Sequence, residues 1–516
     1  MRRITACGLI RPTVMLTNHS DDEFKMIAAI ALDLGTTSIK AGLLGHDGVL
    51  GYIIVKPAPT ISANNGRYES DALAYAAVAE QALDECLAGA GGCKVLGLCS
   101  QRSSFLIWEQ ASGQPLTPLI SWQDARGAAS CDALRAQQGV IRELTGLPLA
   151  PYYFAPKLRG VLQDNPGWLA RLERGELRVG TLDTFLIWRW SGGRQHLTDA
   201  SMAARTLLMD INRQQWSPAL CDLFGIPPHI LPRIEPSAGM NLLLENGLTL
   251  QASIGDQSAA LIASVREDRA EALVNLGTGG FVVRYAPEGV AQPGGYLRTL
   301  VYQDSARHAH FAIEGTINSI AAALAHYPVE ECRAENLAID DVYCLAEPSG
   351  LGAPYFRNDF GIVFSQPVAH LPPQRIAALL LEAIIFRVAR ILEDFHREHA
   401  LESIYLSGGL SGSTCLQQGI AQCAPPTRYC EAAVCGRRCD AVIPAPAAFA
   451  HRVMTATCAV YLVRQGESSL LGAALLAAGM AQAAQRDVEK ILVERGDTAL
   501  PEKYQRWKGW LDGLLA

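Results

Sequence analysis

The sequence contains no apolar run long enough to cross a membrane as a helix. Its richest apolar stretch, "SSLLGAALLAAGMAQAA", is short and built from small residues, whereas a spanning helix needs about 20 apolar residues. Charged residues are few, at 18%, and the net charge of −7 at pH 7 leaves no basic excess. This charge balance argues against a nucleic-acid-binding protein. Because 49% of the residues are hydrophobic, we expect a globular, solvent-facing protein.

We expect no signal peptide in residues 1–25, and the cysteines do not follow the pattern of a disulfide scaffold. In residues 1–25 a brief apolar patch is interrupted by Pro12, whereas a signal peptide needs a longer apolar stretch and a cleavage site. We expect residues 1–25 to form a disordered extension, with Met26 as an alternative start. The fourteen cysteines are scattered, which favours reduced thiols in a cytoplasmic protein.

Glycine turns between short apolar strands are the main organising pattern. At 516 residues the chain predicts two or three domains. The segment "ALDLGTTSIKAGLLG" predicts strand, Gly-Thr turn and strand, and "EALVNLGTGGFVVRY" repeats that order. Helical periodicity in "DALAYAAVAEQALDECLAG" and a third glycine turn in "SIYLSGGLSGS" add to an α/β layered fold. The repeat suggests two related domains with a cleft between them, unless the similarity of the two turns is coincidence.

One carboxylate, Asp256, stands before a small and apolar predicted helix in "SIGDQSAALIAS". An aspartate in this position is typical of a helix N-cap, because it accepts hydrogen bonds from the first free amides. It is also a position from which a catalytic base could face a ligand. The local sequence leaves both interpretations open.

Taken together, these segments resemble the FGGY family of carbohydrate kinases. "ALDLGTTSIKA" and "LVNLGTGGFVV" are similar to its two phosphate motifs, "LSGGLSGS" to its adenosine motif, and "GDQSAAL" to the segment with its catalytic aspartate. The blocks "ISWQDARG", "GTLDTFLIWRWSGG", "AIEGTINS", "GLGAPYF" and "GESSLLGAA" follow in the family's order. The resemblance implies two actin-like (ribonuclease H-like) α/β domains with a cleft between them, and an ATP-dependent phosphotransferase that acts on an alcohol group.

The resemblance assigns the nucleotide and metal sites. Asp33 would hold a magnesium ion through water, which suits one carboxylate at a strand end. Amides, hydroxyls and one ammonium would surround the phosphates of ATP. The implied nucleotide-binding residues are Gly35, Thr36, Thr37, Lys40, Gly277, Thr278, Gly279, Gly408, Gly409 and Ser413. Turn formation is the alternative role for the two threonines, and a solvated surface position for Lys40.

The resemblance is strongest to the glycerol kinase branch, and it makes Asp256 the general base. We expect the dipole of its helix to lower the pKa of this carboxyl. The implied substrate-binding residues are Arg102, Ser103, Trp122, Tyr152, Asp256 and Gln257. Trp122 could instead be core, and Arg102 a structural ion-pair partner.

Ser103 departs from the glycerol kinase pattern, which has glutamate after the arginine. Losing a carboxylate acceptor can change the preferred substrate. The Met-His pair typical of xylulose and sedoheptulose kinases is also missing, although Asp124 and Arg126 are retained. We therefore expect a small polyol or ketose of the glycerol, pentulose or heptulose class as the substrate.

The expected domains are an N-terminal domain over 26–252, a C-terminal domain over 253–484 and a helical tail over 485–516. An insertion at about 427–457 interrupts the second domain. It contains Cys430, Cys435, Cys439 and His451, but a structural zinc site favours tighter paired spacing. We interpret it as a surface excursion.

Two other functions stay open on the sequence alone. A degenerate family member would bind sugar or nucleotide without turnover, as the insertion and Ser103 suggest. A chaperone-type ATPase would share the phosphate motifs but would not explain "ISWQDARG". The expected partners are a small polyol or ketose and ATP with Mg²⁺, with no nucleic acid and no membrane span, and the resemblance allows a homodimer.

Overall fold

The computed structural model describes residues 26–267, 269–286, 294–357, 359–426, 457–464, 466–481, 487–492 and 499–516. The chain divides into two compact units. Unit 1 comprises the described residues of Met1–Ser264, Arg298–Ala312 and Gly466–Arg486. Unit 2 comprises those of Val265–Leu297, Ile313–Gln465 and Asp487–Ala516. The expected boundary at 252/253 falls inside a strand of unit 1, and the predicted domain limits stay predictions.

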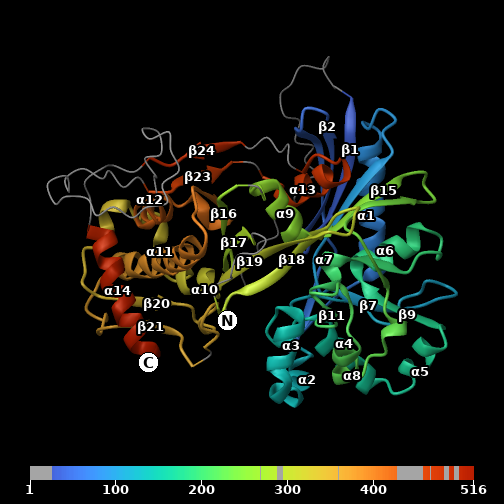
Figure 1. Cartoon of the computed structure of the whole chain (residues 1–516), viewed down its shortest axis with the longest axis horizontal. Coiled ribbons are helices and arrows are strands. Elements are labelled where there is room, and N and C mark those ends of the chain that lie inside the picture. Colours follow the sequence, from blue (N-terminus) through green and yellow to red (C-terminus); the bar gives the residue numbers. More distant parts are fainter. Residues whose placement is uncertain are drawn as a thin grey trace, which may run out of the picture. The chain divides into compact units, whose positions relative to one another are not determined.

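Unit 1 is built on a six-stranded sheet in the order β14-β15-β6-β1-β2-β3 (Figure 1). These strands are β1 (Ile27–Leu34), β2 (Ser38–Gly45), β3 (Leu50–Pro57), β6 (Val95–Ser100), β14 (Ala238–Leu243) and β15 (Thr249–Gly255). β1 pairs antiparallel with β2 and parallel with β6. The strands and the first Gly-Thr turn predicted from residue 27 onward are confirmed.

A smaller sheet in unit 1 has the order β4-β5-β8-β7-β9. Its strands are β4 (Ser62–Asn64), β5 (Arg67–Ser70), β7 (Phe105–Glu109), β8 (Leu119–Ile120) and β9 (Leu177–Thr181). Two strand pairs complete the unit: β10 (Leu197–Asp199) with β13 (Arg233–Glu235), and β11 (Met209–Asp210) with β12 (Gln215–Trp216).

The helices of unit 1 are α1 (Ala72–Leu87), α2 (Ala128–Ala133), α3 (Gln138–Thr145), α4 (Phe154–Asp164), α5 (Trp168–Glu173), α6 (Leu182–Trp190), α7 (Ala200–Ala203), α8 (Pro218–Phe224), α9 (Asp256–Ser264) and α13 (Ser468–Ala477). β1 alternates between two cores. Its Ile30 and Leu32 pack with residues of α1 and α6, whereas Ala29 and Ala31 pack with α13. A strand covered on both faces reads as a continuous apolar run, as "IAAIALDL" does.

α13 approaches its neighbours very closely, and α9 and α13 lie side by side (Figure 1). A Cβ on Gly472 would overlap the carbonyl oxygen of Ala259 in α9, and one on Gly97 would overlap that of Ala473. The small residues of "SSLLGAALLAAG" therefore serve helix-to-helix and helix-to-strand packing. They fix how closely α9, which begins at Asp256, packs against α13.

Unit 2 repeats the central strand arrangement of unit 1. A seven-stranded sheet has the order β18-β19-β17-β16-β22-β23-β24; its strands β16, β17, β22, β23 and β24 belong to unit 2, whereas β18 after Leu297 and β19 up to Ala312 fall in the Arg298–Ala312 segment of unit 1. The strands are β16 (Glu271–Leu276), β17 (Gly280–Tyr285), β18 (Leu297–Gln303), β19 (Ala309–Ile317), β22 (Ser403–Ser407), β23 (Ala459–Val463) and β24 (Val488–Lys490). β16 pairs antiparallel with β17 and parallel with β22, as β1 does with β2 and β6. The predicted duplication is confirmed at the level of strand topology.

The helices of unit 2 are α10 (Ile320–Leu324), α11 (Pro373–Glu398), α12 (Thr414–Cys423) and α14 (Ala499–Leu515), and β20 (Cys344–Ala346) pairs with β21 (Ile362–Phe364). None of the helices in the described residues is both long and apolar enough to cross a membrane. The ten cysteines in the described residues are free thiols.

The predicted insertion lies, apart from Thr457, outside the described residues, as do its three cysteines and His451. Its flanks are described: Pro426 and Thr457 pair as an antiparallel bridge. The two ends that flank residues 427–456 are therefore adjacent in unit 2. Residues 1–25 also lie outside the described part.

Candidate active site

Asp33 lies near the end of β1, on the face of the sheet that α13 covers. It is 5% exposed, and its Oδ2 accepts a hydrogen bond of 2.6 Å from the hydroxyl of Ser469 at the start of α13. Its other oxygen, Oδ1, is buried without a hydrogen-bond partner. Burial raises the pKa of this carboxyl to about 6, and the bond from Ser469 opposes that rise. A buried carboxylate oxygen with free acceptor capacity fits a hydrated magnesium ion.

Asp256 is the first residue of α9. Its Oδ1 accepts from the backbone N–H of Gln257 at 2.7 Å and lies 3.5 Å from Nε of Arg102. Burial raises the pKa of the Asp256 carboxyl, and Arg102 opposes that rise. The expected net lowering by the helix dipole is wrong, because loss of solvent is the larger effect. The charge of Asp256 also raises the pKa of Asp33, which indicates that the two acids act on each other within unit 1.

Arg102 and Ser103 occupy the turn between β6 and β7. The Arg102 side chain lies over Gly255, where a Cβ would come within 2.8 Å of Cδ, so a glycine is needed before Asp256. Ser103 is buried with a positive φ of 64°. Its hydroxyl donates to the carbonyl oxygen of Arg205 at 3.1 Å. The pair thus links the end of β6, the turn after α7 and the start of α9.

Two aromatic side chains of the predicted substrate site are exposed. Trp122 is 42% exposed and Tyr152 is 43% exposed, so the interpretation of Trp122 as core is wrong. The indole N–H of Trp122 donates to the hydroxyl of Thr36 at 2.9 Å. The ring of Tyr152 packs against Tyr153, with centroids 4.5 Å apart. Gln257, next to Asp256, is exposed as well.

Lys40 forms an ion pair with Glu467, the residue before α13. Its side chain is 23% exposed, so it is not a solvated surface lysine. Glu467 and Ser469 come from the block "GESSLLGAA", to which the sequence analysis gave no role. Gly35 and Thr36 lie between β1 and Lys40, and the side chain of Thr37 is exposed.

The remaining predicted nucleotide-binding residues belong to unit 2. Gly277, Thr278 and Gly279 form the turn between β16 and β17, and Thr278 is exposed. Gly408 has a φ of 91°, and a Cβ there would overlap Leu276 at the end of β16. The two glycine turns are therefore adjacent in unit 2. Gly409 follows in the same turn, and Ser413 caps α12 by accepting from the N–H of Leu416 at 3.4 Å.

Sequence reasoning missed three buried residues around Arg102 and Trp122. Lys157 on α4 donates to the carbonyl oxygens of Ser103 and Ser121 at 2.8 and 2.7 Å. Arg205 lowers the pKa of Asp256 through its charge, and the Gln101 side chain binds Thr36. A lysine among apolar helix positions in "FAPKLRGVL" was the one visible signal.

Asp124 and Arg126 have structural contacts. Asp124 is fully buried, and it accepts from the N–H of Tyr68 at 2.7 Å and from the Arg126 guanidinium at 2.8 Å. Arg126 also pairs with Glu69. These bonds fasten β5 to the loop that carries Trp122.

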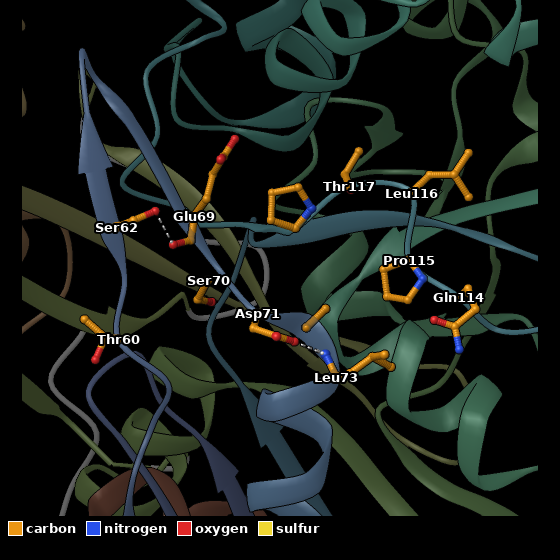
Figure 2. Close-up of a pocket in the computed structure, with 12 residues that line it drawn as sticks. Thr60, Ser62, Glu69, Ser70, Asp71, Leu73, Gln114, Pro115, Leu116 and Thr117 are labelled. Carbon is orange, nitrogen blue, oxygen red and sulfur yellow. Dashed lines mark hydrogen bonds between the residues drawn. The ribbon is translucent and has the colours of Figure 1, made fainter.

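A polar pocket of about 510 Å³ lies beside this region in unit 1 (Figure 2). It is lined by residues from 60–73 and 114–118, and Asp71 there caps α1. It shares no lining residue with the predicted site. In the described part of the chain, no cluster of three or more His, Cys, Asp or Glu side chains could hold a metal ion.

Comparisons with known proteins agree with this geometry. Models of the N-terminal and C-terminal domains of the FGGY family of carbohydrate kinases match residues 28–273 and 272–427. A glycerol kinase from Rhodopirellula baltica is 32% identical over 422 residues, covering 76% of this chain and 77% of that protein. An apulose kinase from Pectobacterium atrosepticum is 32% identical over 416 residues, with 75% and 83% covered.

A solved structure of Plasmodium falciparum glycerol kinase with ADP superposes with a TM-score of 0.79 at 21% identity, covering 96% of this chain and 99% of that one. At that identity the likeness shows the fold alone, and it is the expected two-domain actin-like α/β fold. The domain models and the curated relatives, taken together with Asp33, Asp256 and the repeated Gly-Thr turns, show the family. The chain belongs to the FGGY family of carbohydrate kinases, in its glycerol kinase-like branch, and is an ATP-dependent phosphotransferase that acts on an alcohol group.

Proposed function

We propose that this enzyme phosphorylates a hydroxyl of a small polyol or ketose, with Asp256 as the general base. The observation that carries the proposal is the position of Asp256 at the start of α9. Its carboxylate is held by the N–H of Gln257 and by Arg102, in the same unit as Asp33 and the first Gly-Thr turn.

Asp256 would accept the proton of the attacking hydroxyl. As the new bond between that oxygen and the γ-phosphorus forms, the bond from the γ-phosphorus to the β–γ bridging oxygen breaks, and ADP leaves. The raised pKa of Asp256 makes the carboxylate a better proton acceptor than an ordinary exposed aspartate. Because the transition state of phosphoryl transfer is loose, the position of the base matters more than its strength.

Asp33 fits a magnesium ion through its unpartnered Oδ1, and such an ion would neutralise charge on the phosphates of ATP. Lys40 adds a positive charge beside the first Gly-Thr turn, held in place by Glu467. The amides of 35–37 in unit 1 and of 277–279 in unit 2 are the proposed phosphate donors. Gly408, Gly409 and Ser413 would bind the nucleoside part.

The acceptor would contact Arg102, Trp122, Tyr152 and Gln257 in addition to Asp256. The exposed ring of Trp122 suits a carbon chain, since it offers an apolar face with its N–H already bonded. Ser103 brings no carboxylate, and its proton is used by the carbonyl of Arg205. The positive groups Arg102 and Arg205 therefore favour an acceptor with a carbonyl oxygen, such as a ketose, over a plain triol.

The test is a coupled assay of ADP release with Mg-ATP across glycerol, xylulose, apulose and gluconate. Turnover with any of them supports a kinase, and a higher kcat/KM for a ketose than for glycerol supports the substrate class. Absence of turnover with all acceptors, in a protein that binds nucleotide, would establish a degenerate homologue. ATP hydrolysis that no acceptor stimulates would instead support a chaperone-type ATPase.

A further inference from the structure

The indole of Trp122 and the first Gly-Thr turn are joined by a closed ring of hydrogen bonds. The side-chain N–H of Trp122 donates to Oγ1 of Thr36 at 2.9 Å, and its backbone N–H donates to Oγ of Ser104 at 2.9 Å. Both hydroxyls bind Oε1 of Gln101, at 3.1 Å from Thr36 and 3.0 Å from Ser104. All four residues belong to unit 1.

The direction of every bond in this ring is fixed by chemistry. Indole and backbone N–H groups only donate, and a carboxamide oxygen only accepts. Each hydroxyl therefore receives a hydrogen bond from Trp122 and gives its own proton to Gln101. Gln101 and Ser104 are buried, so water does not compete for the bond between them, whereas the bond from Trp122 to Thr36 lies at the exposed side of the ring.

Tyr75 fixes the orientation of the Gln101 amide and extends the ring to the turn itself. The Tyr75 hydroxyl lies 2.6 Å from the carbonyl oxygen of Gly35, to which it must donate. Its lone pair then accepts from Nε2 of Gln101 at 3.4 Å. If the Gln101 amide were flipped, its Oε1 would face the Tyr75 hydroxyl oxygen, whose only proton is already donated to Gly35. One glutamine thus holds the turn at both Gly35 and Thr36.

A consequence concerns the phosphate contacts. The hydroxyl proton of Thr36 is already used within the ring, so this hydroxyl cannot donate to a phosphate while the ring is intact. Thr37, the next residue, is exposed and is not part of the ring. The side chain of Thr36 therefore faces the acceptor-binding tryptophan rather than the nucleotide.

We propose that Trp122, Thr36 and Gln101 couple the acceptor site to the nucleotide site. Thr36 and Gln101 are positioning residues: through them the indole that contacts the acceptor holds the first Gly-Thr turn in its phosphate-binding conformation. The proposal rests on the proposed function, since it takes Trp122 as an acceptor contact and residues 35–37 as a phosphate turn.

The experiment measures the Kd of the non-hydrolysable ATP analogue AMPPNP with Mg²⁺, by calorimetry on the full chain without any acceptor. Trp122→Phe keeps an aromatic ring and loses the N–H, so we expect AMPPNP to bind about threefold to tenfold more weakly, as for one lost hydrogen bond. Thr36→Val should weaken binding by a similar factor. The double variant should bind no more weakly than the weaker single variant, because both changes open the same ring.

Two further variants separate coupling from general damage. Thr36→Ser keeps a hydroxyl and should rescue the affinity lost in Thr36→Val. Trp216→Phe removes an indole N–H that donates to the carbonyl of Pro232 elsewhere in unit 1, and it should leave the Kd unchanged. Calorimetric stoichiometry reports the folded fraction, so a partly unfolded variant does not imitate a weaker Kd.

Wild-type affinity in Trp122→Phe, or additive effects in the double variant, would overturn the coupling, the latter by showing that Thr36 binds phosphate independently. The outcome is distinct from that of the kinase assay. Coupled Kd values without turnover would leave the ring established in a non-catalytic protein. Turnover with additive Kd values would leave the kinase and remove the coupling. A wild-type chain that does not bind AMPPNP would overturn both.

Discussion

The side chains of the proposed site differ in how much of their hydrogen-bonding capacity a ligand could use. Ser103 gives its proton to the carbonyl of Arg205, and Thr36 gives its own to Gln101. Gln257 and Thr37 are exposed. Asp33 keeps one buried oxygen without a partner. These differences decide which residues can contact a substrate directly.

Replacing the proposed base should slow phosphoryl transfer strongly without preventing nucleotide binding. Asp256→Asn keeps the shape of the side chain and removes its proton-accepting charge, so we expect kcat to fall by about 10²- to 10⁴-fold. Calorimetry should still show AMPPNP binding. As a contrast, Asp124→Asn alters a buried structural carboxylate and should lower the thermal midpoint instead. A near wild-type kcat in Asp256→Asn would remove this aspartate from the mechanism.

Residue 103 should control the choice between a triol and a ketose. Ser103→Glu restores a carboxylate beside Arg102 that can accept from two hydroxyls. We expect the ratio of kcat/KM for glycerol to that for a ketose to rise by about tenfold or more. Steady-state kinetics with both acceptors measure the ratio, with Ser112→Glu on an exposed turn as the control. An unchanged ratio would show that position 103 does not select the acceptor.

At the scale of elements, α4 and α13 position the proposed site through buried contacts. Lys157 of α4 ties the turn after β6 to the segment after β8 through two carbonyl oxygens. α13 carries Ser469 against Asp33 and packs on α9. The exposed site residues are thus fixed by buried bonds on other elements.

The buried amino group of Lys157 should make the free energy of unfolding depend on pH. Burial lowers the pKa of Lys157 to about 7, below the value of an unfolded lysine, about 10.4. Between these values the unfolded chain binds more protons, so this group adds stability as pH rises. Relative to Lys157→Met, wild type should gain up to about 1.4 kcal/mol per pH unit above pH 7.

Urea unfolding of both proteins at pH 6, 7, 8 and 9 measures this difference. Leu158→Ala removes packing from the same helix without a titrating group, and its deficit should stay constant with pH. A constant deficit for Lys157→Met as well would contradict the lowered pKa of Lys157.

Two glycine-to-alanine changes in helices should have opposite effects. In Gly472→Ala the new Cβ would overlap Ala259, so α9 and α13 must separate. We expect a loss of stability of about 1–3 kcal/mol and lower kcat, since Ser469 and Asp256 would move. Gly509→Ala in α14 meets open space and should gain up to about 1 kcal/mol from helix propensity. Equal effects in thermal unfolding would argue against close packing at Gly472.

At the scale of the whole molecule, the proposed catalytic and nucleotide-binding residues are divided between two units of related topology. Asp33, Lys40, Asp256 and the proposed acceptor contacts belong to unit 1, to which the chain returns for α13 late in the sequence. Gly277–Gly279 and Gly408 belong to unit 2. Each unit supplies one Gly-Thr turn between antiparallel strands.

Removing residues 427–456 should leave catalysis intact. Pro426 and Thr457 are bridge partners, so an Asn-Gly linker can join them as a two-residue hairpin turn, and kcat/KM should stay within about threefold of wild type. The acceptor assay and thermal unfolding measure the outcome. A folded but inactive deletion would show that these residues take part in the function.

Much of the fold could be predicted because it depends on local patterns. Apolar strands ended by Gly-Thr turns recur at residues 27–45 and 271–285. The repeated order of strand, turn and strand predicted the duplication. The position of Asp256 before its helix was equally visible. The role of "GESSLLGAA" was not, because it depends on an approach to β1 and α9 from more than 200 residues away in sequence.

The sequence by itself determined the pattern of strand, Gly-Thr turn and strand and its repetition. It also determined that Asp33 lies near a strand end and Asp256 at a helix start, because each of these features is encoded by neighbouring residues. Only the tertiary structure decided which side-chain groups can still bind a ligand or accept a proton. It raised rather than lowered the pKa of Asp256, paired Lys40 with Glu467, and used the Thr36 proton inside a ring with Trp122 and Gln101. Burial and hydrogen-bond partners come from distant segments, and no local pattern records them.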